Sequence, residues 1–163
     1  MFLTYGFLRA CGVGRPAAAY GAVACSWSTG HLMHLLHPHP AVTAMLPGLL
    51  GCIERLFQSV ERGERGASWR WATPLALATA IACHTGHPEI LFVDALVCAV
   101  HAIVHAIVCA FATRSWRVAA SAAPALASAA VLGALLAAPQ LLPFGKCMRE
   151  SDMYRRPTHF LAQ

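Results

Sequence analysis

Charged residues are scarce in this sequence. Asp, Glu, Lys and Arg make up 12% of its 163 residues, whereas 58% are hydrophobic. A soluble domain usually carries about 25% charged residues. The apolar residues also come in blocks of roughly 20, which is the length of helix that crosses a bilayer. The sequence therefore predicts an all-α integral membrane protein, a polytopic bundle of transmembrane helices.

Several common motifs are missing as well. The chain contains no CxxC or HExxH motif, no glycine-rich phosphate loop, no nucleophile elbow and no framework for a catalytic triad. These absences remove the usual sequence grounds for a zinc-finger, metalloprotease, nucleotide-binding or serine-hydrolase assignment. The seven cysteines mostly lie inside apolar segments. We therefore expect them to be small buried hydrophobic residues and not disulfides or metal ligands.

The basic residues form no continuous run or stripe. The formal net charge is +5, but the Lys and Arg residues stand between apolar blocks. That is where they flank membrane spans, so the distribution predicts a lipid bilayer as partner and no nucleic acid. No cleavable signal is visible, because the first residues lack a basic start and the first apolar stretch stops at Arg9.

Proline divides the chain into helices. Pro16, Pro40 and Pro88 each suit the first turn of a helix, because the missing N–H is not needed there. We expect about five membrane-spanning helices and the end of a preceding one, at about residues 16–36, 40–57, 69–83, 88–112 and 118–138. Residues 1–145 then form one transmembrane helical region, and residues 146–163 form an outer loop that is cut short.

The distribution of Lys and Arg among the loops predicts the orientation. The loops around 9–15, 55–70 and 114–117 hold two, four and two basic residues, and the loops at 37–40 and 84–88 hold none. The two sets alternate along the chain, so we expect the arginine loops on the cytoplasmic side. The histidine- and proline-rich loops, together with APQLLP, then share the opposite face.

A shared polar site is predicted on that opposite face. In HTGHPE, His84, His87 and Glu89 cluster at a helix N-terminus, where unpaired N–H groups and a partial positive charge favour an anion. The pattern indicates either contact with a phosphate or metal ion, or a simple polar helix cap. The amide of APQLLP and basic residues of the tail that follows would complete the site: Gln140, Lys146 and Arg149.

A second histidine group precedes it in HLMHLLHPHP. His31, His34 and His37 are three residues apart and so share one helix face. Imidazoles on one face can bind Zn²⁺ or a similar metal. Histidines at a membrane interface can equally be plain amphipathic residues, so these three are weak metal candidates.

A polar stripe runs along the fourth expected helix. Asp94, Cys98, His101, His105 and Cys109 follow one another at spacings of four, three, four and four. Ionisable groups that face lipid are costly, so the stripe should face other helices, with the alanine-rich fifth helix as the expected partner. Helix packing is the simplest interpretation, and haem ligation or a proton path are the alternatives. Asp94, about two turns from the outer end, is the member expected to line a site.

Five features then follow in order along roughly residues 5–151. They are FLRACGVGRPAAAYGAVACSWSTGHL, HPHPAVTAMLPGLLGCIERLF, the tryptophan-rich start of the third helix, GHPE, and AAPQLLP followed by an Arg and Ser151. In this order they resemble the bacterial YfhO-like membrane proteins, a family in the GT-C class of glycosyltransferases. GHP and QLLP are short motifs, whereas five features in register are fairly specific.

The resemblance implies a multi-pass enzyme of the bacterial inner membrane that uses a polyprenyl-phosphate-linked sugar on the non-cytoplasmic face. Glu89 stands where the family usually has Gln, and Lys146 stands where an acidic residue is expected. The carboxylate of Glu89 would repel a bound phosphate unless a divalent metal ion bridged the two, so a divalent metal is the cofactor to expect. The outer loop that carries the catalytic acid of GT-C enzymes is absent, so the resemblance implies an internal fragment that is inactive alone.

Two other classes of protein remain open. One is a histidine-rich membrane subunit that binds haem or a metal. The other is a structural membrane module without a ligand. A Soret band in the absorbance spectrum would identify a haem protein.

Overall fold

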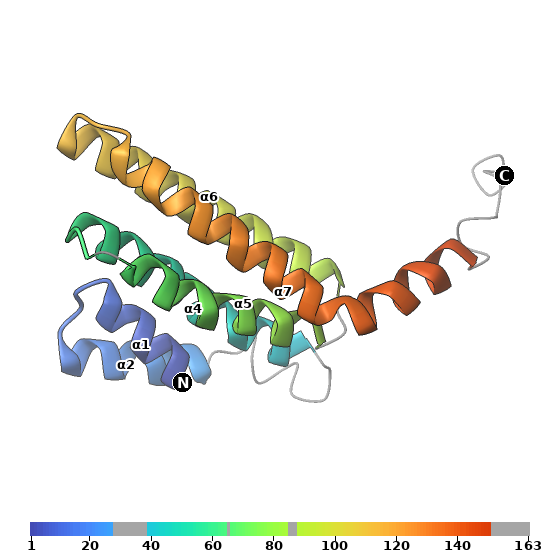
Figure 1. Ribbon diagram of the computed structural model, residues 1–163. Coiled ribbons are helices and arrows are strands. Elements are labelled where there is room, and N and C mark those ends of the chain that lie inside the picture. The colour runs from blue at the N-terminus through green and yellow to red at the C-terminus, as the bar shows by residue number, and fades with distance from the viewer. Residues whose placement is uncertain (28–38, 65, 85–87, 151–163) are drawn as a thin grey trace, which may run out of the picture.

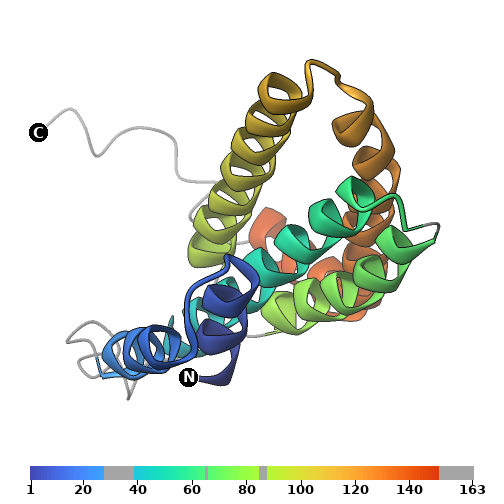
Figure 2. The same cartoon turned by 90° about the vertical axis from the view of Figure 1, so that its left-hand side faces the viewer.

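The computed structural model describes residues 1–27, 39–64, 66–84 and 88–150. These residues form six α-helices and no strand, which confirms the all-α prediction. Consecutive helices pair into three hairpins that lie beside one another (Figures 1 and 2).

The first hairpin is short. α1 covers Phe2–Ala10 and α2 covers Arg15–Ser26. The sequence predicted a helix over 16–36, of which residues 28–36 lie outside the described part of the chain. With 12 residues, α2 is about 18 Å long, whereas the hydrocarbon core of a bilayer is about 30 Å thick.

The second hairpin is central. α4 covers His39–Glu61 and α5 covers Ala67–His84. The sequence predicted helices at about 40–57 and 69–83, so α4 ends later than expected. Its end is followed by Gly63, whose φ of +67° belongs to the left-handed region that commonly terminates helices. The polar residues before this glycine continue the helix instead of forming a loop.

The third hairpin contains the two helices that are long and apolar enough to cross a membrane. α6 covers Pro88–Thr113 and α7 covers Arg117–Glu150. The most apolar stretch of α6 is only 11% buried, and that of α7 is 22% buried. Most of their large apolar side chains therefore face outwards. About five spans were predicted, and two helices in the described ranges meet the requirement of length and composition.

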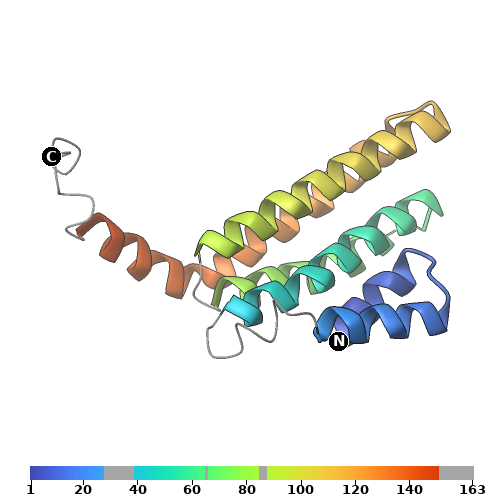
Figure 3. The ribbon, with the colours of Figure 1, turned by 180° about the vertical axis from the view of Figure 1, so that it is seen from behind.

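α7 continues where the sequence predicted its end. Pro139 and Pro143 were expected to stop the helix near residue 138, but it runs to Glu150 with both prolines inside. Proline removes one helical hydrogen bond and crowds the preceding turn, so it can kink a helix without ending it. Figures 1 and 3 show such a bend, beyond which the red part of α7 leaves the bundle. Residues 141–150 are all exposed.

The core lies between α4, α5 and α7. Leu56 and Phe57 of α4 are its largest fully buried side chains. α7 contributes a buried stripe of small residues: Ala122, Ala125, Ala129, Gly133 and Ala137. A Cβ atom on Gly133 would lie 2.8 Å from Cβ of Thr79, which shows how closely α7 approaches α5. α7 thus packs mainly on α5, and the prediction that it faces the polar stripe of α6 holds only for Asp94 and Cys98, which line a cavity together with Leu126 and Ala130 of α7.

The arginine-bearing turns share one end of the bundle. The turns that follow α1, α4 and α6 lie together at the left of Figure 1 and at the right of Figure 3. The start of α4, the end of α5 and the start of α6 lie at the opposite end. This is the grouping that the count of basic residues predicted.

Candidate metal centre

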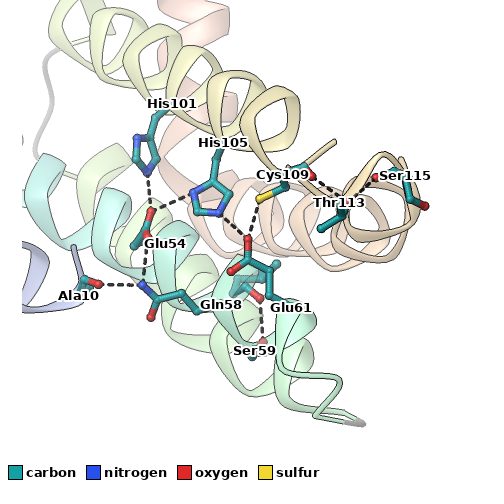
Figure 4. Close-up of polar contacts among 11 residues, drawn as sticks. Ala10, Glu54, Gln58, Ser59, Glu61, His101, His105, Cys109, Thr113 and Ser115 are labelled. Carbon is teal, nitrogen blue, oxygen red and sulfur yellow. Dashed lines mark hydrogen bonds and ion pairs between the residues drawn. The ribbon is translucent and has the colours of Figure 1, made fainter. Parts of the chain in front are cut away.

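The polar stripe of α6 faces α4. His101, His105 and Cys109 point towards Glu54 and Glu61, which lie two helical turns apart on α4 (Figure 4). These three residues therefore face an acidic face of α4, whereas Asp94 and Cys98 of the same stripe line a cavity together with Leu126 and Ala130 of α7.

Glu54 is the centre of the cluster. Its Oε2 atom lies 3.4 Å from Nε2 of His101 and 3.1 Å from Nδ1 of His105. The side chain of Glu54 is 12% exposed, and those of His101 and His105 are 26% and 16% exposed. One carboxylate oxygen and two imidazole nitrogens thus converge in a largely buried space between two helices.

Neighbouring groups hold these side chains in place. Nε2 of Gln58 donates to Oε1 of Glu54 at 3.0 Å and to the carbonyl of Ala10 at 2.7 Å. On the far side of His105, Nε2 lies 3.4 Å from Oε1 of Glu61. A metal-binding imidazole usually donates its other N–H to a carboxylate, carbonyl or water. Glu61 stands where such a supporting carboxylate is required.

Aromatic rings orient both imidazoles. His105 stacks on Phe57 with ring centroids 4.5 Å apart and an interplanar angle of 22°. His101 meets Phe7 edge-on at 6.1 Å. Phe57 belongs to α4 and Phe7 to α1, so residues from three helices shape the site.

Two of the three ligand separations are close to those around a bound transition metal. Zn²⁺ binds imidazole nitrogen and carboxylate oxygen at about 2.0–2.1 Å, which places neighbouring ligands of a tetrahedron about 3.3 Å apart. The two distances from Glu54, 3.4 Å to His101 and 3.1 Å to His105, are close to that value. The ligand atoms of all three residues lie within 4.8 Å of one another. A fourth position would remain for water or another ligand.

One ring nitrogen of His101 supports the same assignment. Its Nε2 is buried and has no hydrogen-bond partner among the described residues. The Glu54 oxygen at 3.4 Å is near enough for an ion pair but does not make a hydrogen bond. A buried polar atom without a partner is costly, and a cation between the two side chains would satisfy both.

A second possible group lies one turn further along α6. Cys109 Sγ donates to Oε1 of Glu61 at 2.6 Å, and Glu61 also faces His105. Oxygen and sulfur on one tetrahedral Zn²⁺ would lie about 3.5 Å apart. The Glu61–Cys109 pair would have to separate to bind a metal, whereas the Glu54 group needs little movement.

Haem ligation finds less support. A haem iron with two axial histidines needs one on each side of its plane. His101 and His105 project from the same helix towards the same carboxylate, and their ring centroids are 6.3 Å apart. They do not form a facing pair.

Two of the residues predicted for the outer-face site come together. Nε2 of Gln140 donates to the backbone carbonyl of His84 at 3.4 Å. The ring Nδ1 of His84 itself lies 2.8 Å from the carbonyl of Ala80. The remaining histidine candidates lie outside the described residues: His31, His34, His37 and His87.

The other predicted residues are dispersed. Glu89 is exposed in the first turn of α6, and Asp94 is buried on the inner side of the same helix. Lys146 and Arg149 are exposed on the part of α7 that leaves the bundle. In the described part of the chain, neither makes a hydrogen bond or ion pair with His84.

The sequence did not predict the site residues of α4, which are Glu54, Gln58 and Glu61. They recur at spacings of four and three, which is a helical stripe like the one on α6. The predicted helix ended at Phe57, so Gln58 and Glu61 were assigned to a polar loop. The stripe becomes recognisable only when the helix is continued to Gly63.

These features define an all-helical protein with two helices able to cross a membrane and a His/Glu/Cys cluster between helices. Comparison of the chain with protein-family models, curated proteins and solved structures found no match. The resemblance to the YfhO-like glycosyltransferases therefore stays a prediction.

Proposed function

We propose that this chain is a multi-pass membrane protein that binds a divalent transition-metal ion, with Zn²⁺ as the best match, between α4 and α6. Glu54, His101 and His105 are the ligands. The observation that carries the proposal is the convergence of Nε2 of His101 and Nδ1 of His105 on one oxygen of Glu54, at 3.4 and 3.1 Å.

The supporting residues fit this assignment. Gln58 occupies the second oxygen of Glu54, and Glu61 faces the second nitrogen of His105. Each of these two ligands is thus held by a group that would not bind the ion. A bound Zn²⁺ would supply a positive charge and an open coordination position, and it would link α4 to α6.

Plain helix packing is the competing interpretation of the same cluster. Polar contacts between membrane helices contribute about 0.6 kcal/mol on average, which is little compensation for placing several ionisable groups inside a bundle. Packing alone also leaves Nε2 of His101 without a hydrogen-bond partner in the described ranges. A metal ion accounts for both features.

The placement in a bacterial inner membrane is what the resemblance implies, and two observations support a membrane protein in this orientation. α6 and α7 are long, apolar and mostly exposed. The arginine-bearing turns lie at one end of the bundle (Figure 1), where Arg55, Arg62 and Arg70 line one hollow together with Trp71. Arg and Lys on the cytoplasmic side and Trp at the interface are the pattern of such proteins. We therefore place this end at the cytoplasmic surface.

The test is the metal content of the purified protein after exposure to Zn²⁺ and removal of the excess. We expect about one equivalent in the wild type and almost none after His105→Ala, because three ligands are needed to hold the ion. His84→Ala is the matched control, since His84 lies at the opposite end of the bundle (Figure 1) and should not change the metal content. Equal zinc in the His105 and His84 variants would reject the site.

A second candidate function is the glycosyl transfer that the resemblance implies. The Gln140–His84 hydrogen bond favours it, because it joins the segments APQLLP and HTGHPE at the end opposite the arginine turns. On this proposal these segments hold a polyprenyl-phosphate-linked sugar on the non-cytoplasmic face. Gln140→Ala and His87→Ala should each weaken the binding of polyprenyl phosphate about tenfold, or 1.4 kcal/mol. This function would be rejected if the wild type showed no saturable binding of polyprenyl phosphate. It would also be rejected if both variants bound it as tightly as the wild type.

A further inference from the structure

A cavity of about 270 Å³ lies between α4, α5, α6 and α7, apart from the metal centre. Its wall consists mainly of Leu and Ala side chains, and none of Glu54, His101 and His105 lines it. Of its polar residues, Thr79 is satisfied, because its hydroxyl donates to the carbonyl of Leu75 at 2.8 Å. Among the described residues of the wall, Asp94 is the one acidic residue.

Asp94 is a buried carboxylate in the wall of this cavity. It is 2% exposed, and its Oδ2 has no hydrogen-bond partner among the described residues. No Lys, Arg or His lines the cavity in the described part of the chain. A carboxylate in apolar surroundings requires a donor or an opposite charge. The cavity therefore combines an apolar wall with one carboxylate whose Oδ2 has no donor or positive charge beside it among the described residues.

The wall is open towards the outside of α6. Ala95 and Ala99 line the cavity and are also exposed, so only small side chains stand between the cavity and the surface at this point of α6. The outer surface of α6 around them is apolar, with Phe92, Leu96 and Val100 exposed. A molecule dissolved in the bilayer could thus enter laterally, without passing through water.

We propose that this cavity binds a small amphiphile with a hydrocarbon body and an ammonium head, with the ammonium on Asp94. A carboxylate only accepts hydrogen bonds, so the ligand must donate. A charged donor bonds a carboxylate about twice as strongly as a neutral donor does. An anionic head would face the like charge of Asp94. The volume is slightly below the range of roughly 300–1,000 Å³ that is usual for ligand pockets, so the ligand is small.

The experiment uses the full-length protein in lipid nanodiscs and two photoreactive probes, octylamine and octanol analogues that carry a diazirine on the chain. Both probes partition into the bilayer, and their attachment sites are mapped by mass spectrometry. We expect the amine probe to label the cavity-lining part of α6 about tenfold more than the alcohol probe, a difference of about 1.4 kcal/mol. Asp94→Asn keeps the shape of the side chain and should abolish that preference.

Ala99→Leu supplies a second variant that does not alter the carboxylate. It fills the cavity and should suppress labelling by both probes. Ala112→Leu is its matched control, because Ala112 is exposed on the same helix but does not line the cavity. Equal labelling by amine and alcohol, an amine preference that survives Asp94→Asn, or unchanged labelling in Ala99→Leu would overturn the proposal. The zinc content of these variants tests the metal centre separately, because neither Asp94 nor Ala99 is a proposed metal ligand.

Discussion

Nδ1 of His105 lies 3.1 Å from Oε2 of Glu54, although the two residues are 51 positions apart in the chain. The other ring nitrogen of His105 lies 3.4 Å from Glu61. One imidazole of α6 therefore joins two carboxylates that lie two turns apart on α4. Because the ring also stacks on Phe57, its position is determined from three sides.

The Glu54–His105 contact should contribute measurably to stability even without metal. In a double-mutant cycle of Glu54→Ala and His105→Ala, with a chelator present, we expect a coupling free energy between the average and the largest value for interhelical polar contacts, about 0.6 and 1.7 kcal/mol. The free energy of unfolding in mixed detergent micelles provides the measurement. Additive effects of the two substitutions would show that the contact is not made.

Zn²⁺ should stabilise the folded protein through Glu54. At a free Zn²⁺ concentration of one hundred times Kd, linkage predicts an increase of about 2.7 kcal/mol in the free energy of unfolding. Glu54→Gln should lose most of this increase, because a neutral amide is a poor metal ligand. Glu89→Gln, an exposed position in the first turn of α6, should retain it. An equal response of the two variants would assign the zinc effect to another site.

Gly133 should tolerate no side chain. A Cβ there would lie 2.8 Å from Cβ of Thr79 and 3.0 Å from the backbone carbonyl of Ala76. The backbone atom cannot move aside alone, so Gly133→Ala should force α7 away from α5 and cost about 1–3 kcal/mol.

Gly145→Ala is the control on the same helix, since no atom of the described residues lies within 4 Å of a Cβ at that position. It should be neutral, or stabilising by up to about 1 kcal/mol through the higher helix propensity of Ala. Thermal unfolding of both variants distinguishes these cases. Equal midpoints would contradict the close packing of α5 and α7.

The proposed orientation predicts which cysteines are accessible. In a variant without the native cysteines, Glu64→Cys lies at the arginine end and Glu89→Cys at the other (Figure 1). A membrane-impermeant thiol reagent added outside cells should label position 89 at once and position 64 only after the membrane is opened. The reverse pattern would invert the orientation, and labelling of both from outside would exclude a membrane between them.

The starts of the helices could be predicted because their signals are local. Pro88 begins α6 as expected, since proline suits the first helical turn whatever surrounds it. The end of α7 could not be predicted in this way. Pro139 and Pro143 weaken a helix locally, but whether it stops or bends depends on the rest of the chain.

The candidate site could likewise be predicted only in part from local sequence. The spacing of His101 and His105 predicted that they face another helix, because that follows from the period of an α-helix alone. The partner could not be predicted, since several segments offered a suitable surface. The short side chains around Gly133 fit α5, and this leaves α4, with Glu54, for α6.

X-ray absorption at the zinc edge tests the central claim most directly, because it reports the atoms bound to the ion. For the zinc-loaded protein we predict nitrogen and oxygen neighbours at about 2.0–2.1 Å, with the multiple scattering of two imidazoles. Cys109→Ser should leave this spectrum unchanged, because the thiol pairs with Glu61 outside the proposed ligand set. A sulfur neighbour at about 2.3 Å, or an ion without imidazole neighbours, would contradict a centre built from Glu54, His101 and His105.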